Sequence, residues 1–148
     1  MPLQQELVDY EISTDPQRLD LEVIHRFLTE ESYWSRGIPR STVARAVANS
    51  LCFGAYQGAA QVGFARIVTD KSTFALLADV FVLEAHRGKG LSKRLMRSVV
   101  EHQDLQGLRR FLLLTSDAHG LYSQFGFEAI GNPSRFMEIL RPDIYRAR

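Results

Sequence analysis

The stretch that organises the chain is residues 74–100, FALLADVFVLEAHRGKGLSKRLMRSVV. It starts with an apolar run over 74–83 that only Asp79 interrupts, and such a run predicts a strand buried on both faces. After a short turn, apolar residues recur at helical spacing from Leu91 to Val100, with basic residues on the other side. The stretch therefore predicts a strand that passes through a glycine-containing loop into a helix.

The loop between the predicted strand and helix suits an anionic group. The first amides of a helix have no intrahelical acceptor, and the helix dipole adds positive charge there. Gly88 and Gly90 allow the backbone to approach a ligand closely, while Arg87, Lys89 and Lys93 add full charges. We therefore expect phosphate or pyrophosphate binding, and the alternative is a tight turn that carries solvated charges.

Two other glycine-rich phosphate motifs are excluded. The dinucleotide fingerprint G-x-G-x-x-G requires a third glycine where this chain has Arg94. The Walker pattern G-x-x-x-x-G-K-[ST] does not occur in the sequence. The loop must therefore be compared with motifs of a different class.

The 148 residues carry a formal net charge of +1, and 45% of them are hydrophobic. This composition predicts a single globular domain over 1–148. The small net charge argues against nucleic-acid binding, because a strong basic excess would dominate that affinity. No secretory signal or long apolar span is visible, so we expect a cytoplasmic protein with no membrane partner. The only cysteine, Cys52, lies in an apolar run and is expected to be a buried, reduced thiol.

The rest of the chain alternates short strands and short helices. Alternating or apolar runs predict further strands at 8–13, 51–56, 61–69, 111–115, 127–130 and 136–140. Helical spacing predicts helices at 21–28, 41–50 and 118–124, the last of them capped by Ser116 or Asp117. No spacing typical of metal ligands stands out.

The loop before the central helix resembles the coenzyme A loop of the GNAT superfamily of N-acetyltransferases. The family signature is Gln/Arg-x-x-Gly-x-Gly/Ala, and this chain has Arg87-Gly88-Lys89-Gly90-Leu91-Ser92, with Ser92 as the departure. A second stretch, Tyr122-Ser-Gln-Phe-Gly126-Phe127, resembles the Y-x-x-x-G-F motif that closes the cofactor site in that family. Thr115 stands where the family often carries Asn. Both motifs occur in the family's order, separated by one helix and one strand.

The resemblance implies an α/β (α+β) fold, with a mixed, strongly twisted sheet of about six to seven strands flanked by about four helices. It also implies that the strands at 74–83 and 111–115 splay apart, so that the pantetheine of acetyl-CoA enters between them. The pantetheine would bind to the backbone of Phe81 and Val82. The pyrophosphate would bind to the amides of Arg87, Gly88, Lys89, Gly90, Leu91 and Ser92.

Acyl transfer to an amine needs a neutral amine, a stabilised oxyanion and a proton for the departing thiolate. The resemblance implies that Tyr122 is the general acid and that a backbone N–H, which we expect to be that of Val82, stabilises the oxyanion. Two residues compete for the role of base. Asp79 is a carboxylate in an apolar strand, which requires a partner or a cleft, and a structural Asp is the alternative. His119 precedes Tyr122 by three residues on a predicted helix, and a hydrogen bond to Asp117 is the alternative there.

Residues 31–40 form an irregular loop that contains the bulky side chains of Tyr33, Trp34 and Arg36. The loop can simply place its two aromatic rings at the edge of the core. The resemblance implies instead that it lines the acceptor side, which makes Trp34 and Arg36 candidates for substrate binding.

These observations lead us to expect direct transfer of an acetyl group from acetyl-CoA to a primary amine of a small molecule or peptide, within a ternary complex. A non-catalytic acyl-CoA-binding regulatory module is the first alternative. A scaffold protein with a vestigial loop is the second. Because GNAT proteins often pair through their C-terminal strands, a homodimer is a further expectation.

Overall fold

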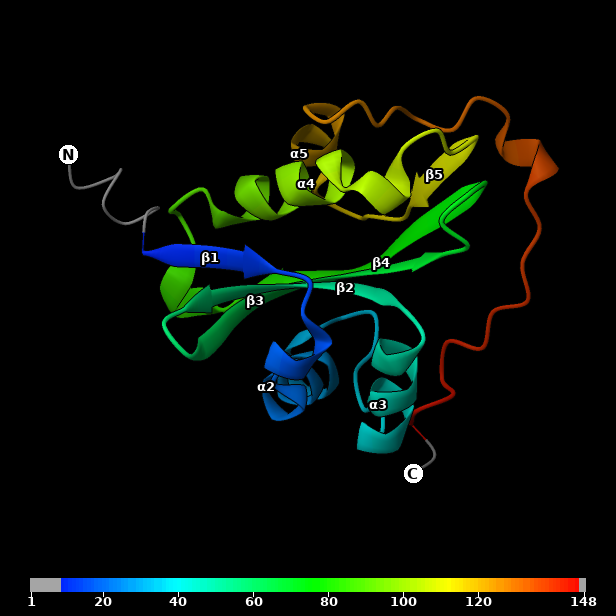
Figure 1. The fold of residues 1–148 in the computed structure, drawn as a ribbon. Coiled ribbons are helices and arrows are strands. Elements are labelled where there is room, and N and C mark those ends of the chain that lie inside the picture. The colour runs from blue at the N-terminus through cyan, green and yellow to red at the C-terminus, as the bar shows by residue number, and fades with distance from the viewer. Residues whose placement is uncertain (1–8, 147–148) are drawn as a thin grey trace.

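The computed structural model describes residues 9–146 and shows a five-stranded sheet between two helical layers (Figure 1). The strands lie side by side in chain order, as β1 Tyr10–Ser13, β2 Leu51–Gln57, β3 Ala60–Thr69, β4 Phe74–Val82 and β5 Arg110–Leu113. Neighbours are antiparallel from β1 to β4, whereas β5 runs parallel to β4. A parallel neighbour requires a crossover connection, which contains the central helix.

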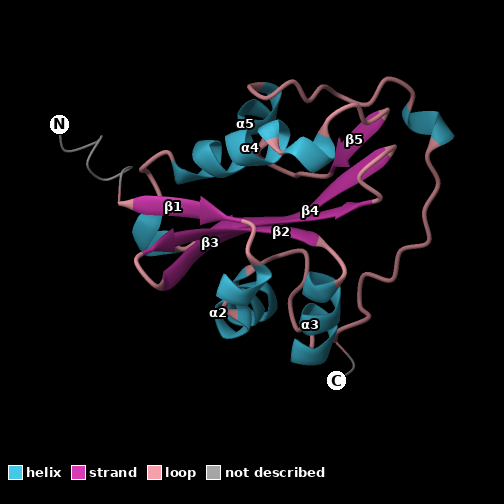
Figure 2. Cartoon of the chain, in the orientation of Figure 1, coloured by secondary structure: helices cyan, strands magenta, loops and turns pink. Residues whose placement is uncertain are grey.

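Helices cover both faces of the sheet (Figure 2). One face carries α4 Leu91–Glu101 and α5 His119–Ser123, and the other carries α2 Leu21–Arg26 and α3 Arg40–Ala48. Short 3₁₀ turns lie at Pro16–Arg18, Glu84–His86, Gln103–Leu105 and Pro133–Arg135. α2 continues into a π-helical turn, Phe27–Glu31. The mixed sheet and the four α-helices of the described residues confirm the predicted α/β class.

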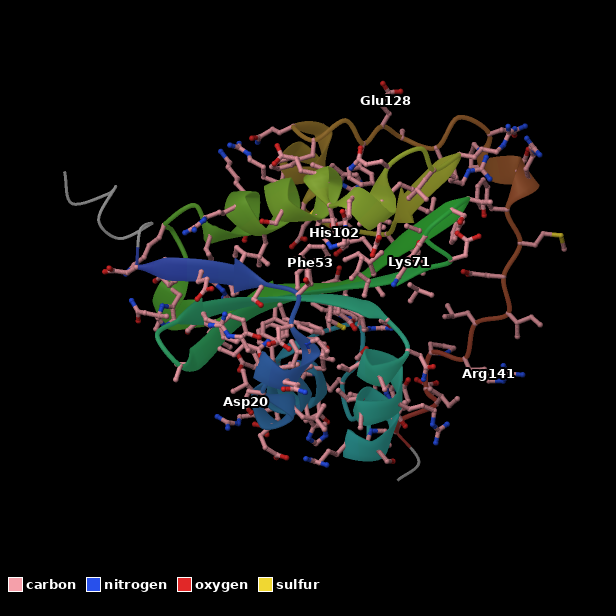
Figure 3. The ribbon with its side chains drawn as sticks, viewed as in Figure 1. Asp20, Phe53, Lys71, His102, Glu128 and Arg141 are labelled. Carbon is pink, nitrogen blue, oxygen red and sulfur yellow. The ribbon has the colours of Figure 1, made fainter. Side chains whose placement is uncertain are left out.

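Each face of the sheet has its own apolar core, and β4 contributes to both. Its burial alternates, because residues 76, 78 and 80 are only half-buried, so the predicted burial on both faces is only partial. The α4 stripe is fully buried and consists of Leu91, Leu95, Met96 and Val99. On that face Phe53 meets the ring of His102 edge-on, with the centroids 5.4 Å apart (Figure 3). On the opposite face Phe81 of β4 stacks on Phe27, with centroids 4.1 Å apart and planes 11° from parallel.

A β-bulge divides β4 into two halves. In the register with β3, Ala78 is an extra residue between Leu77 and Asp79. The parallel pairing with β5 also ends at Leu77, opposite Leu113, although β4 continues to Val82. A bulge bends its strand and increases the local twist, which explains why β4 and β5 separate at this point.

The two strands predicted at 127–130 and 136–140 are not formed, so the predicted six to seven strands are more than the five seen in the described residues. After α5 the chain runs irregularly past β5 and down to the side of α3 (Figure 1). There Tyr145 packs against the apolar core beneath α2 and α3, and its carbonyl approaches Gly37. A strand needs a partner edge as well as a suitable composition, and this anchored end draws the segment across the sheet's edge rather than along β5.

The other predicted elements lie within a few residues of their expected positions. The first predicted strand begins at Val8, which lies outside the described residues, and is seen from Tyr10 onward. Over residues 9–146 no helix combines the length and apolarity that crossing a bilayer requires. In the same part of the chain, no group of three His, Cys, Asp or Glu side chains is placed to hold a metal ion.

Candidate active site

The loop before α4 presents backbone N–H groups at an open helix end. Gly88 and Gly90 adopt the left-handed conformation, with φ angles of 79° and 78°, which glycine tolerates without steric cost. Gly90 is the N-cap of α4, and no side chain makes a capping hydrogen bond there. A Cβ at Gly88 would meet no atom within 4 Å, so the loop borders open space. The amides of 91–93 are therefore available to an external acceptor.

Two side-chain contacts attach this loop to the sheet. The hydroxyl of Tyr10 in β1 lies 2.8 Å from Nδ1 of His86. Nε of Arg87 donates to the carbonyl of Val82 at the end of β4, at 2.9 Å. The guanidinium of Arg87 thus points back toward β4. The prediction for Arg87 concerned its backbone amide, which this side-chain contact leaves unchanged. Because both contacts are to strand residues, the sheet fixes where the α4 entrance lies.

Beyond the bulge, one edge of β4 has no strand partner among the described residues. The N–H of Leu83 donates to Val62 at 2.8 Å and therefore points toward β3. N–H groups alternate in direction along an antiparallel strand. Those of Val80 and Val82 therefore point to the other edge of β4, beyond the end of its pairing with β5. The prediction for Val82 fits this geometry. The N–H of Phe81 faces β3, so Val80 is a better candidate for contact with a ligand than Phe81.

The buried carboxylate of Asp79 is engaged on both oxygens. Oδ1 accepts from the indole Nε1 of Trp34 at 2.7 Å, and Oδ2 accepts from Nε of Arg66 at 2.7 Å. Arg66 also donates to the hydroxyl of Ser50, at 3.1 Å. Asp79 is only 5% exposed, so these donors stabilise a charge that burial alone would disfavour. Residues 32–39, which join the π-helical turn to α3, are here named the Trp34 loop. The arrangement favours Asp79 as an anchor for this loop over Asp79 as a free base.

The Trp34 loop contacts both sides of the opening between β4 and β5. Trp34 binds Asp79 on β4, while the hydroxyl of Tyr33 accepts from Oγ of Ser116, at 2.8 Å, in the loop after β5. The two aromatic rings meet edge-on with centroids 5.0 Å apart, and both remain partly exposed. A loop that joins both strands in this way has the placement expected of a substrate-site wall, so Trp34 remains a candidate for substrate binding.

Arg36, the other predicted substrate residue, points elsewhere. Its guanidinium donates to the carbonyl of Glu30 at 3.1 Å, at the end of the π-helical turn. The sequence prediction omitted Tyr33, Arg66 and Ser116 from the site. Tyr33 and Ser116 are 83 positions apart, so no local sequence pattern indicates their contact. The sequence indicated a role for Tyr33 only through its position beside Trp34 in the same loop.

The turn that leads into α5 differs from the prediction. Ala118 is the N-cap of this helix, rather than Ser116 or Asp117. The Ala118 N–H donates to Oγ1 of Thr115 at 3.0 Å. Thr115, which stands where the family often has Asn, therefore supplies a side-chain acceptor that orders the entry to α5.

Tyr122 lies on α5, half-buried against the α4-side core. Burial raises the pKa of its phenol, and the neighbouring Tyr33 and Asp117 act in the same direction. The phenol therefore keeps its proton at neutral pH, as a general acid must. His119 is exposed at the start of the same helix, and both residues line a hollow of about 1390 Å³ beside β5. We call this hollow the β5 groove; its walls are β5, α5 and the segment 127–138.

Comparison with known proteins identifies the family. The family model of the acetyltransferase (GNAT) domain matches residues 48–129, which include both sequence motifs. A curated candidate acetyltransferase of Gibberella zeae is 32% identical over 138 residues, covering 78% of this chain and 77% of that protein. The chain therefore belongs to the GNAT acetyltransferase family.

Solved structures agree with this assignment. A crystal structure of a candidate GNAT-family acetyltransferase from Xanthomonas campestris pv. campestris matches with a TM-score of 0.90 and 51% identity, covering 92% of this chain and 96% of that one. A candidate acetyltransferase from Deinococcus radiodurans R1 matches with a TM-score of 0.73 and 21% identity, covering 93% and 92%. At that lower identity the second structure supports the fold alone.

Proposed function

We propose that this acetyltransferase moves the acetyl group of acetyl-CoA to a primary amine of a small molecule or peptide. The observation that carries the proposal is the combination of the open helix end at α4 with the unpaired edge of β4. A carrier with a diphosphate and an extended arm of amides matches both features. Its diphosphate would bind the amides of 91–93, and its pantetheine amides would bind the backbone of Val80 and Val82. Lys89 and Lys93 add positive charge near the same helix end.

In the proposed reaction, the neutral amine attacks the thioester carbonyl and a tetrahedral intermediate forms. The N–H of Val82 points to the open edge of β4 and stabilises the oxyanion of this intermediate. The C–S bond then breaks, and the phenol of Tyr122 donates its proton to the departing thiolate. The amine nitrogen gives up a proton to a base, so the products are an N-acetylated amine and free coenzyme A.

His119 is the base that the geometry favours. Its ring is exposed in the β5 groove, which Tyr122 also lines, whereas both oxygens of Asp79 are held by donors. A ring nitrogen of an imidazole can accept the proton that the attacking amine loses. Asp79 then acts indirectly, because it fixes Trp34, and the exposed rings of Tyr33 and Trp34 contact the amine substrate.

Cys52 supports direct transfer without a covalent enzyme intermediate. Burial raises the pKa of its thiol to about 12, so the thiol is protonated and a poor nucleophile at neutral pH. We expect iodoacetamide to leave the activity intact, and Cys52→Ala to keep the wild-type kcat. Inactivation of the wild type but not of Cys52→Ala would instead indicate a route through the thiol.

Release of free coenzyme A thiol across a panel of amines tests the proposed function. The panel contains aliphatic amines, aromatic amines and peptides with a free amino terminus or a lysine, and mass spectrometry identifies the product. We expect thiol release that depends on the amine and equals the acetylated amine formed. Release that is the same without any amine would contradict the proposal. Coenzyme A binding without release for any amine would support the non-catalytic acyl-CoA-binding module.

A further inference from the structure

Two aromatic rings of the Trp34 loop meet at nearly a right angle beside the opening between β4 and β5. The rings of Tyr33 and Trp34 have centroids 5.0 Å apart and planes that cross at 82°. Tyr33 is 62% exposed and Trp34 40%, so both rings are accessible to a ligand. We call this pair the aromatic corner. Because the face of an aromatic ring carries negative charge density, two perpendicular faces suit a bound cation.

Both rings of the aromatic corner are held in place by contacts behind them. Trp34 donates its indole N–H to Asp79 at 2.7 Å, and its ring lies against the buried ring of Phe27, with centroids 6.4 Å apart. The hydroxyl of Tyr33 accepts a hydrogen bond from Oγ of Ser116 at 2.8 Å. Side chains that are already fixed lose little conformational freedom when a ligand binds, so the corner is preorganised.

The residues that flank the aromatic corner carry more negative than positive charge. Glu30 and Glu31 are exposed in the π-helical turn from which the loop starts, and the exposed Asp117 follows Ser116. The cation of the loop, Arg36, donates to the carbonyl of Glu30 at 3.1 Å rather than to a ring. A positively charged ligand therefore meets three carboxylates and one guanidinium near the corner.

The aromatic corner also lies close to the groups that we propose for the chemistry. Burial is the main cause of the raised pKa of Tyr122, and the nearby Tyr33 adds to it, which places the two phenols near each other. Ser116, which holds Tyr33, directly precedes the turn into α5, the helix that carries His119 and Tyr122. A ligand bound at the corner therefore extends from there toward the proposed acid and base.

We propose that the aromatic corner binds a second positive charge on the amine substrate, so that the acceptor is a diamine or another amine with a distant ammonium group. This inference rests on the proposed function, because it names the class of acceptor for the same site. An aliphatic amine is largely protonated at neutral pH, and only its neutral form attacks a thioester. In a diamine, one ammonium stays charged at the corner, while the other end loses its proton and attacks. The transfer follows the proposed reaction, in which a C–N bond forms and the C–S bond breaks.

The first test compares cadaverine with hexylamine as acceptors. The two molecules have the same number of non-hydrogen atoms and differ at one end, where cadaverine has an ammonium and hexylamine a methyl group. With allowance for the two equivalent amines of cadaverine, its kcat/KM should be roughly 2- to 30-fold higher, which is the range that cation–π contacts supply. Equal values for the two acceptors would overturn the proposal. No thiol release with any amine would contradict the proposed function instead, and the corner would then be tested by binding.

The second test changes the exposed ring of the corner. Tyr33→Leu removes the ring, whereas the matched control Tyr33→Phe keeps the ring and removes only the hydroxyl that Ser116 contacts. Because Tyr33 is exposed, circular dichroism should show that both variants are folded. We expect Tyr33→Leu to lower the preference for cadaverine over hexylamine by at least about twofold, and Tyr33→Phe to keep it. An unchanged preference in Tyr33→Leu, or an equal loss in both variants, would show that the ring face does not bind the charge.

The third test needs no catalysis, because Trp34 is the only tryptophan of the chain and its fluorescence reports on the corner directly. The probe is tetramethylammonium chloride, whose cation has no N–H and cannot be acetylated. We expect a saturable change in emission for the wild type and Tyr33→Phe, a weaker affinity for Tyr33→Leu, and no such change with sodium chloride at the same concentrations. No saturable change in the wild type, or the same change with sodium chloride, would overturn the proposal. A saturable change without thiol release from any amine would support the cation site and contradict the proposed function.

Discussion

Replacing Tyr122 with phenylalanine is expected to lower kcat by roughly 10²- to 10⁴-fold, which is the usual contribution of a positioned acid. The change removes the hydroxyl and keeps the ring, which meets Phe127 edge-on with centroids 6.2 Å apart. The fold and the affinity for coenzyme A should therefore change little. Initial rates at saturating acetyl-CoA measure kcat, and calorimetric titration with coenzyme A measures the affinity.

The pH profile of kcat checks the same role independently. Because burial raises the pKa of Tyr122, the acid form persists through neutral pH, and the rate should fall only as the pH rises past that raised pKa. Tyr122→Phe should lack this alkaline decrease. Tyr145→Phe is the matched control, since Tyr145 packs on the opposite side of the sheet and should keep the wild-type kcat. If Tyr122→Phe also keeps the wild-type kcat, another group protonates the thiolate.

Asp79→Ala is expected to lower the free energy of unfolding by about 3–5 kcal/mol, the usual cost of removing one partner of a buried ion pair. Arg66, only 18% exposed in its side chain, would lose the carboxylate at 2.7 Å. The indole of Trp34 would lose its acceptor at the same time. Urea denaturation of both proteins, followed by circular dichroism, measures the difference.

The exposed pair of Arg40 and Glu22 supplies the control for Asp79→Ala. Glu22→Ala removes a carboxylate from an arginine in the same way, but at the surface, where such a pair contributes about 0–1 kcal/mol. If Asp79→Ala is no more destabilising than Glu22→Ala, the buried network does not hold the Trp34 loop. The amine KM of Asp79→Ala should rise as well, because Trp34 loses its anchor to β4.

The centre of the fold could be predicted because its signals are local. The apolar run of β4, the two loop glycines and the apolar stripe of α4 occupy one continuous stretch of sequence. The burial of each element follows from its own periodicity, and the structure has β4 at Phe74–Val82 and α4 at Leu91–Glu101. The left-handed Gly88 and Gly90 also agree with the motif that indicated the loop.

The contacts that hold the Trp34 loop against β4 and the loop after β5 could not be predicted in this way. The hydrogen bond of Trp34 to Asp79 spans 45 positions, and that of Ser116 to Tyr33 spans 83, so no periodicity encodes them. The strands expected at 127–130 and 136–140 failed for a related reason. Composition shows that a segment fits a strand, but pairing also depends on the path of the chain, and here the segment runs past the free edge of β5 without pairing.

Titration calorimetry with coenzyme A tests most directly whether the entrance of α4 binds the diphosphate. Gly90→Ala and Gly107→Ala both force alanine into a left-handed conformation, at φ angles of 78° and 72°, but only Gly90 lies at that entrance. We predict that the wild type and Gly107→Ala bind coenzyme A alike, and that Gly90→Ala binds about tenfold more weakly, equivalent to about 1.4 kcal/mol. No binding by the wild type, or equal affinity in Gly90→Ala, would contradict the account.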